Sequence, residues 1–151
     1  MTTYLLDTSA LLTLRDDEPG ADRVAKVLQQ AQNGDVRVVG CFLTLMEVFY
    51  RVWRDEGEAA GRLAHEQCQA LPIQWVHESP ALLMKAAEVK AIYPLSIADA
   101  WKAACALLEG AILMHKDPEF AAVPVQQEIL PLKSVKRKKA LNPNGTYFGY
   151  Y

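Results

Sequence analysis

The fold is decided near the start of the chain, by the stretch Tyr4-Leu5-Leu6-Asp7-Thr8-Ser9-Ala10-Leu11-Leu12. A short apolar segment ends in an acid, two hydroxyl residues follow, and an apolar pattern with helical spacing then begins. An acid at the carboxyl end of a first strand lies where an open α/β sheet gathers its ligands. Asp7 is therefore expected either to cap the following helix or to hold a metal ion, and the other acids of the chain must decide between the two.

The rest of the chain alternates short β-type segments with longer helical ones, separated by proline and glycine residues. Strands are predicted at residues 4–6, 36–39, 73–76, 111–114 and 129–130. Helices are predicted at residues 10–14, between Pro19 and Asn33, at 42–54, at 58–71, between Pro80 and Pro94 and at 96–109, with a helical turn at 117–120. This alternation predicts an α/β sandwich in which helices flank a central, mostly parallel sheet.

The composition is that of one compact domain followed by a tail. The chain has 151 residues, 51% of them hydrophobic, which is enough for a substantial core. The domain is assigned to residues 1–132, because residues 133–151 contain no acid, a basic run at 136–139 and a terminal cluster of aromatic residues. The tail is predicted to be flexible and solvated, or to bind RNA through electrostatic attraction and base stacking.

The cysteine pattern and the apolar runs bear on the cellular compartment. Cys41, Cys68 and Cys105 are widely spaced and form no CxxC pair, so no zinc site is predicted. Each lies in an apolar pattern and is expected to be a buried reduced thiol, which is typical of a cytoplasmic protein. The chain has no signal-peptide pattern and no apolar run near the ~20 residues of a membrane helix. We expect a cytoplasmic protein without membrane association.

Four acids occupy the same kind of place in the predicted fold. Asp7 ends a strand, Glu47 and Asp99 lie in the first turn of their helices, and Asp117 stands between a strand and Pro118. Strand ends and the helix starts that follow them share one edge of such a sheet. The four acids could therefore converge in one pocket although they are scattered in the sequence.

Each acid also has a simpler interpretation as a helix cap. Thr44 with Glu47, and Ser96 with Asp99, have the spacing of a capping box, and acids at helix starts are favoured by the helix dipole. All four acids nevertheless follow apolar residues, which caps at the surface do not require. Taken together, the four acids favour a shared pocket, whereas each one alone leaves the two interpretations open.

Four carboxylates in one pocket would repel one another, and burial without compensation would raise their pKa values. A hard divalent cation removes the repulsion, and ligation by oxygen alone suits Mg²⁺ or Mn²⁺. Such an ion lowers the pKa of a bound water and neutralises charge on a phosphate. The pattern therefore favours hydrolysis of phosphodiester bonds.

Four segments carry a resemblance to a known family: Leu6-Asp7-Thr8-Ser9-Ala10-Leu11-Leu12, Thr44-Leu45-Met46-Glu47-Val48, Leu95-Ser96-Ile97-Ala98-Asp99-Ala100 and Asp117-Pro118-Glu119-Phe120. In order and spacing they resemble a PIN-domain ribonuclease, in particular a toxin of the VapC type, over about residues 3–132. The resemblance implies a PIN-like fold and Mg²⁺- or Mn²⁺-dependent cleavage of RNA. It also implies a homodimer that a cognate antitoxin protein holds inactive.

The resemblance assigns roles to the acidic quartet, which comprises Asp7, Glu47, Asp99 and Asp117. Asp7 and Asp99 would be the main direct metal ligands, and Asp117 would ligate directly or through water. Glu47 would orient a metal-bound water, with some role as a general base. Thr8 or Ser9 would hydrogen-bond to the ligands, or would cap the helix instead.

The chain departs from the family pattern just before Asp117, where the family has Thr followed by Gly or Asn. Here His115 and Lys116 stand, so the geometry of the loop is open. His115 is expected to be structural or to contact substrate or a carboxylate, and Lys116 to contact a phosphate or pair with an acid. Glu119 is a candidate substitute ligand, although an acid at a helix start is the simpler interpretation.

Further candidates concern phosphate contacts and interfaces. Arg15, Arg51, Arg54 and Lys116 are candidate phosphate contacts, with a solvated helix face as the alternative for Arg51 and Arg54. Three tryptophans lie in periodic segments and are expected to be core or dimer contacts: Trp53, Trp75 and Trp101.

Two other functions stay open. The first is a phosphotransfer or phosphatase domain with Asp7 as its nucleophile, which is disfavoured because no second acid follows two residues on. The second is a non-catalytic PIN module that binds RNA through the basic tail. Retention of all four acids argues against it.

Overall fold

A computed structural model gives the structure of the chain and describes residues 1–132. The predicted basic and aromatic tail, residues 133–151, lies outside the described residues. The elements follow in the order β1 (Thr3–Leu6), α1 (Thr8–Arg15), α2 (Ala21–Gln32), β2 (Arg37–Cys41), α3 (Phe42–Glu56), α4 (Glu58–Ala70), β3 (Gln74–Val76), α5 (Pro80–Ile92), α6 (Ile97–Glu109), β4 (Ile112–His115), the 3-10 helix η1 (Pro118–Ala122) and β5 (Gln127–Ile129). The predicted alternation of strands and helices is confirmed.

The central sheet has five strands in the order β3-β2-β1-β4-β5, and every pairing is parallel. The predicted sheet was mostly parallel, and the described sheet is wholly so. β1 pairs with β2 on one side and with β4 on the other, so the strand order reverses at β1. The carboxyl ends of β1 and β4 are therefore the topological switch point, where α/β sheets bind their ligands.

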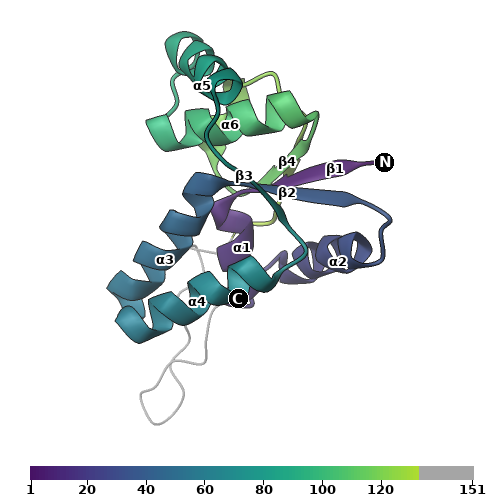
Figure 1. Cartoon of the computed structure of the whole chain (residues 1–151). Coiled ribbons are helices and arrows are strands. Elements are labelled where there is room, and N and C mark those ends of the chain that lie inside the picture. The colour runs from purple at the N-terminus through teal and green to yellow at the C-terminus, as the bar shows by residue number, and fades with distance from the viewer. Residues whose placement is uncertain (133–151) are drawn as a thin grey trace.

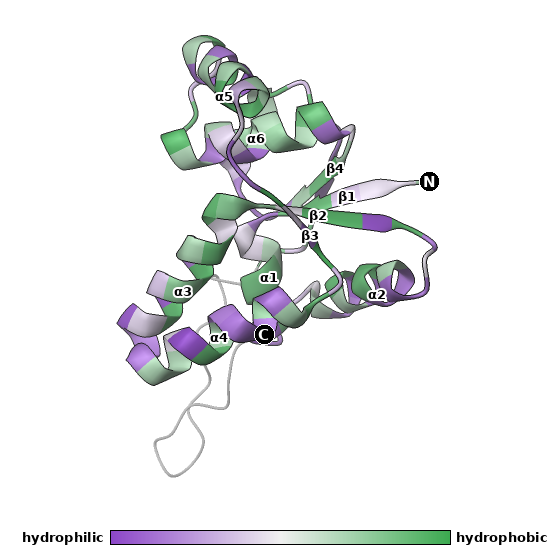
Figure 2. Ribbon diagram, viewed as in Figure 1, coloured by the Kyte–Doolittle hydropathy of each residue, from purple (hydrophilic) through white to green (hydrophobic). Residues whose placement is uncertain are grey.

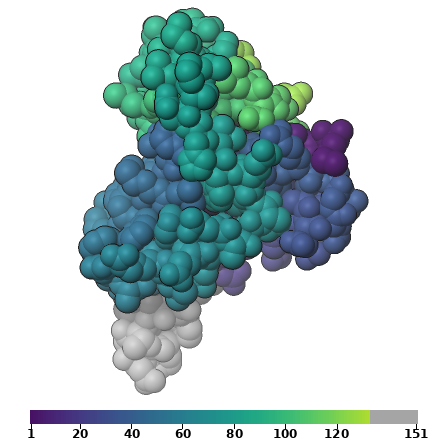
Figure 3. Space-filling model, viewed as in Figure 1, coloured from purple at the N-terminus to yellow at the C-terminus, as the bar shows by residue number. Residues whose placement is uncertain are grey.

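Helices cover both faces of the sheet, as Figure 1 shows: α5 and α6 lie on one face and α1 to α4 on the other. Neighbouring strand residues point to opposite faces, so Leu5 and Leu113 enter the core under α5 and α6, whereas Leu6 and Met114 enter the core under α1 to α4. Figure 2 shows β2 and β4 as mostly hydrophobic, which is typical of strands buried on both faces. In the space-filling view, the teal segment between α4 and α5 crosses from one helical layer to the other (Figure 3).

Two element boundaries differ from the predictions for identifiable reasons. β2 continues through Gly40 and Cys41, because Gly40 lies under the ring of Trp75 in β3. A Cβ at position 40 would lie 2.4 Å from Trp75 Cζ3, so only glycine allows the two strands to pair here. α1 begins at Thr8 rather than Ala10, because Asp7 caps it directly after β1.

The predicted Thr44–Glu47 capping box is wrong. β2 turns into α3 without an intervening loop, and Cys41 is the N-cap residue. Thr44 therefore lies inside the first turn of α3, and Glu47 lies in the second turn rather than the first. Ser96, in contrast, is the N-cap of α6, and its Oγ accepts the Asp99 backbone N–H at 3.2 Å.

The cysteines are buried as expected, whereas the tryptophans differ from one another in exposure. Cys41, Cys68 and Cys105 are buried free thiols. Trp101 packs edge-on against Phe42 at 5.4 Å, while Trp53 is 45% exposed. Within residues 1–132, no helix has both the length and the apolar character needed to cross a membrane.

Candidate active site

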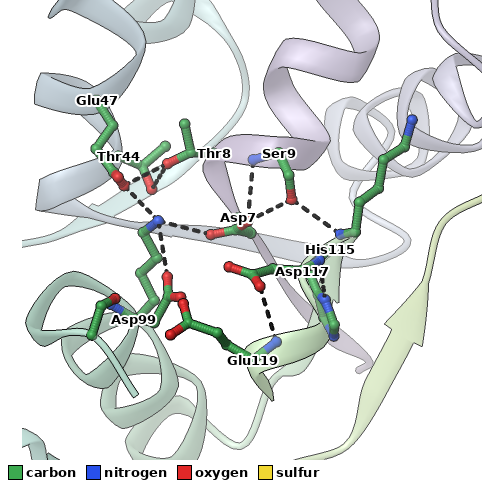
Figure 4. A network of polar contacts seen from close by, with 12 residues as sticks. Asp7, Thr8, Ser9, Thr44, Glu47, Asp99, His115, Asp117 and Glu119 are labelled. Carbon is green, nitrogen blue, oxygen red and sulfur yellow. Dashed lines mark hydrogen bonds and ion pairs between the residues drawn. The ribbon is translucent and has the colours of Figure 1, made fainter. Parts of the chain in front are cut away.

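All four predicted acids line one pocket of about 430 Å³ at the carboxyl edge of the sheet. Asp7 follows β1 and Asp117 follows β4, so these two flank the switch point. Glu47 reaches the pocket from α3 and Asp99 from the first turn of α6 (Figure 4). The topology thus gathers acids that lie far apart in the sequence.

Asp7 caps a helix and faces the pocket at the same time. Its Oδ2 accepts the Ser9 backbone N–H at 3.1 Å and the Ser9 hydroxyl at 2.5 Å, which caps α1. Its Oδ1 lies 3.0 Å from the Nζ of Lys102. Burial alone would raise the pKa of Asp7, but Lys102 and the Ser9 hydrogen bonds outweigh it and hold the pKa below its usual value. The helix-cap interpretation of Asp7 is confirmed, and its other oxygen faces the pocket.

Lys102 is the residue at this site that the sequence analysis missed. It lies on α6 with only 3% of its side chain exposed, and its Nζ contacts carboxylates from three elements. The distances are 3.0 Å to Asp7 Oδ1, 2.5 Å to Glu47 Oε1 and 3.6 Å to Asp99 Oδ1. Figure 4 shows the side chains of Glu47, Asp7 and Asp99 facing the same space in the pocket, with dashed lines that mark these ion pairs. These ion pairs raise the pKa of Lys102 although burial alone would lower it.

The spacing of the sequence did contain a signal for Lys102. It follows Asp99 by three residues on a helix, so the two side chains share one face of α6. Lysine is rarely buried without a partner. A lysine on the same helix face as a predicted site acid, among alanines 100, 103 and 104, therefore pointed to an ion pair inside the pocket.

A hydroxyl pair fixes Glu47 in the pocket. The Thr8 hydroxyl donates to Glu47 Oε1 at 2.8 Å and lies 3.0 Å from the Thr44 hydroxyl oxygen. Thr8 and Thr44 are both buried. Thr8 therefore supports a pocket acid, and Ser9 supports Asp7, as the resemblance implied for one of the two.

We call Asp7, Glu47 and Lys102 the inner half of the pocket, and Asp99, Asp117 and Glu119 the outer half. In the outer half, one carboxylate oxygen from each residue lies within 4.8 Å of the others. Burial is the main cause that raises the pKa of Asp99 to about 8, and hydrogen bonds to the carboxyl groups of Glu119 and Asp117 add to it. Glu119, considered only as a substitute from the sequence, thus belongs to the cluster.

The outer half fits a divalent cation. Its donors are carboxylate oxygens from three residues, the ligand chemistry that Mg²⁺ and Mn²⁺ prefer. Within residues 1–132, every salt bridge of the pocket carboxylates goes to Lys102, and neither Asp117 nor Glu119 forms one. Burial and the neighbouring carboxyl groups of Glu119 and Asp117 raise the pKa of Asp99, although Lys102 at 3.6 Å acts in the opposite direction.

His115 shapes the loop that carries Asp117. Its ring is buried, its Nδ1 accepts the Asp117 backbone N–H at 2.9 Å, and its Nε2 lies 2.8 Å from Gln127 Oε1. Since Nδ1 accepts, the proton is on Nε2 and is donated to Gln127. Of the two readings, the structural one therefore describes His115, and the unusual residue leaves Asp117 in the pocket.

The candidate phosphate contacts separate by position. Arg51 and Lys116 line the pocket. The Nζ of Lys116 also lies 3.6 Å from Glu18, and its backbone N–H donates to Ser9 Oγ at 3.1 Å. Arg15 instead forms two hydrogen bonds to Glu56, at 2.6 and 3.1 Å, and Arg54 pairs with its neighbour Asp55 on the surface.

The fold and the pocket define an α/β protein with an acidic site at the switch point of a parallel sheet. The PIN domain family model matches residues 4–126, and the chain belongs to this family. No curated protein sequence is similar enough to count as a match. The predicted family and its PIN-like fold are confirmed.

Several solved structures are similar to this chain in fold. VapBC2 of Rickettsia felis, solved with a DNA fragment from its promoter, has a TM-score of 0.70 at 16% identity and covers 86% of this chain and 100% of its own. VapBC of Salmonella typhimurium, also DNA-bound, has a TM-score of 0.70 at 16% identity, and the match covers 85% of this chain and 98% of the Salmonella chain. VapC20 of Mycobacterium tuberculosis, described as a sarcin–ricin loop cleaving toxin, has a TM-score of 0.65 at 17% identity, covering 85% and 99%. At these identities the likeness concerns the fold.

Proposed function

We propose that this chain is a Mg²⁺- or Mn²⁺-dependent endoribonuclease and the toxin of a toxin–antitoxin pair. The observation that carries the proposal is the convergence of Asp7, Glu47, Asp99 and Asp117 in one pocket of a PIN domain. The outer half of that pocket has the donor chemistry for a divalent ion. A basic residue that lines the pocket, Arg51, suits a polyanionic substrate.

The residues of the chain divide the work of hydrolysis. Asp99, Asp117 and Glu119 would hold the ion, which when bound lowers the pKa of a water and neutralises charge on the phosphodiester. Lys102 fixes Asp7 and Glu47 and lowers the negative charge that the RNA must approach. Arg51, which lines the pocket, would contact a phosphate of the RNA. His115 holds the Asp117 loop through its Nδ1.

Partners and location follow from the same proposal. One solved structure that is similar in fold is described as a toxin–antitoxin complex from Klebsiella pneumoniae, so we propose a cognate antitoxin protein for this chain. We also propose that the chain forms a homodimer and acts in the cytoplasm, as the family resemblance implies. The proposal concerns RNA as a class of substrate.

The test is RNA cleavage by purified protein freed of metal and then supplied with Mg²⁺ or Mn²⁺. We expect cleavage that stops with chelator, and a loss of roughly 100-fold or more in Asp99→Asn and Asp117→Asn, above the loss typical of groups that only support a ligand. Asp35→Asn, at an exposed acid outside the pocket, is the control and should cleave normally. Cleavage that persists in chelator, or in both pocket variants, would contradict the proposal.

The phosphotransfer alternative is disfavoured by the surroundings of Asp7. An aspartate nucleophile needs an oxygen that is free to attack. Oδ2 of Asp7 accepts two hydrogen bonds from Ser9, and Oδ1 lies 3.0 Å from the Lys102 ammonium, whose charge would reduce its nucleophilicity. The alternative of a non-catalytic module depends on the basic tail, which lies outside the described residues. Normal RNA binding without cleavage would favour it.

A further inference from the structure

Lys102 is a charged residue in a stretch of α6 whose other buried residues are mostly small. Its neighbours on α6 are small and buried, including Ala100, Ala103 and Ala104, and an apolar side chain would suit the same face of the helix. The side chain is instead a cation that is 3% exposed. A charge this deeply buried persists only when its partners compensate for the lost hydration.

The ammonium group of Lys102 lies among three carboxylates. An ammonium group has three N–H donors, and three carboxylate oxygens surround it, those of Asp7, Glu47 and Asp99. The contacts are closest in the inner half, at 2.5 Å to Glu47 and 3.0 Å to Asp7, and longer to Asp99 at 3.6 Å. Lys102 therefore stands where a cation bridging Asp7 and Glu47 would have to bind.

Two cations cannot share the inner half. A divalent ion ligated by Asp7 Oδ1 and Glu47 Oε1 would touch the same two oxygens as the ammonium and would be repelled by it at close range. The other oxygen of Asp7 is taken by the N–H and hydroxyl of Ser9. The outer half is different, since Asp117 and Glu119 have no salt bridge among residues 1–132.

We propose that Lys102 is a built-in cation that permanently fills the inner half of the pocket, so that the chain binds a single divalent ion, in the outer half, at Asp99, Asp117 and Glu119. This inference rests on the proposed function, because that proposal supplies the divalent ion. Lys102 is then a positioning residue: it holds Asp7 and Glu47 in place of a metal and directs the ion toward Glu119. Asp7 is consequently a partner of the lysine and no direct ligand.

The decisive measurement is the number of Mn²⁺ ions bound per chain, counted by electron paramagnetic resonance on chelator-stripped protein. We expect one ion for the wild type. Glu119→Gln should weaken Mn²⁺ binding by at least about tenfold, the lower end of the loss seen when a group that supports a metal site is removed. Asp7→Asn should weaken it by less, and asparagine still caps α1.

Variants of the lysine test its role directly. Lys102→Met should open the inner half and raise the count to two ions, whereas Lys102→Arg keeps the charge and should keep the count at one. Lys85→Met is the matched control, because Lys85 also lies on a helix and pairs with a carboxylate, Glu88, but does not line the pocket. If Lys102→Met does not fold, the comparison of wild type, Asp7→Asn and Glu119→Gln decides alone, because none of these removes the lysine.

The outcomes separate this inference from the proposed function. Two Mn²⁺ ions on the wild type, a folded Lys102→Met that binds one, or Asp7→Asn that loses Mn²⁺ as fully as Glu119→Gln would each overturn the role of Lys102. If such a protein still cleaves RNA with Mg²⁺, the nuclease proposal stands without it. One ion bound in the outer half without any RNA cleavage supports the role of Lys102 and contradicts the nuclease.

Discussion

The two halves of the pocket treat the same chemical group in opposite ways. In the inner half, Lys102 lies 3.0 Å from Asp7, and together with Ser9 it holds the pKa of Asp7 below its usual value despite burial. In the outer half, burial and the neighbouring carboxyl groups raise the pKa of Asp99 to about 8. Two buried aspartates in one pocket are thus driven apart in pKa by what surrounds them.

This difference shows that convergence of acids does not by itself define a metal site. In the inner half Lys102 offsets part of the negative charge of Asp7 and Glu47, whereas in the outer half neither Asp117 nor Glu119 forms a salt bridge among residues 1–132. A divalent ion binds most favourably where the carboxylates have no other cation beside them. The comparison therefore predicts that the two halves respond differently to loss of the lysine, to pH and to loss of a supporting hydroxyl.

The largest effect should come from removing the charge of Lys102. In chelator, Lys102→Met leaves Asp7 and Glu47 buried without a cation, and removal of one partner from a buried ion pair costs about 3–5 kcal/mol. We expect the free energy of unfolding, measured with urea, to fall by that amount. Adding Asp7→Asn and Glu47→Gln to Lys102→Met should recover part of the loss, because the charges are then removed together.

The matched control is Lys85→Met, which removes a lysine from a partly exposed pair whose side chains are 32% and 57% exposed. Such pairs contribute about 0–1 kcal/mol. If Lys102→Met costs no more than Lys85→Met, the inner half is not held together by its lysine, and the contrast between the halves is wrong.

The second prediction concerns pH and the outer half. Because the folded pKa of Asp99, about 8, is above its ordinary value of 3.8, the folded state binds the extra proton between these limits. The contribution of Asp99 to stability is full below about pH 4 and is lost as the pH rises through about 8. The Tm of the metal-free protein should therefore fall, on the order of a few degrees, between about pH 5.5 and 8.5.

Asp99→Asn is the test of that assignment, since an amide stays neutral at every pH and should remove most of the fall in Tm. Asp7, with its lowered pKa, titrates below this window and should not contribute to it. Mg²⁺ should reverse the trend in the wild type, because ligation requires the deprotonated carboxylate and strengthens with pH. If the Tm of Asp99→Asn falls with pH as much as that of the wild type, a group other than Asp99 is responsible for the pH dependence.

Much of the fold could be predicted from the sequence, because its signals are local. The apolar run before Asp7, the stop at Asn33 and the cap at Ser96 each depend on a few neighbouring residues, and the structure confirms them. The extension of β2 through Gly40 depends on Trp75, which is distant in sequence and becomes a neighbour only in the sheet. Hence the sequence predicted which helices and strands exist, whereas some of their ends are set by tertiary packing.

The sequence predicted which acids form the candidate site, but it did not predict which charged groups they pair with. The four acids could be found because each follows an apolar strand or opens near a helix start. The partner of Asp7 could not be assigned, because Lys102 lies 95 positions away on α6 and its reach across the pocket depends on how α6 packs. The same holds for His115, whose role became visible only with its bonds to Asp117 and Gln127.

The smallest effect should come from the hydroxyl of Ser9. It donates to Asp7 Oδ2 at 2.5 Å and accepts the Lys116 backbone N–H at 3.1 Å, so Ser9→Ala removes both bonds. Asp7 keeps the Ser9 backbone N–H and Lys102, so we expect the free energy of unfolding to fall by only about 1–2 kcal/mol. Ser9→Thr keeps a hydroxyl and should lose less than half of that. If Ser9→Ala destabilises the protein as much as Lys102→Met does, the Ser9 hydroxyl contributes as much as the lysine to stabilising the buried Asp7 charge. The contrast between the two halves of the pocket would then not depend on Lys102.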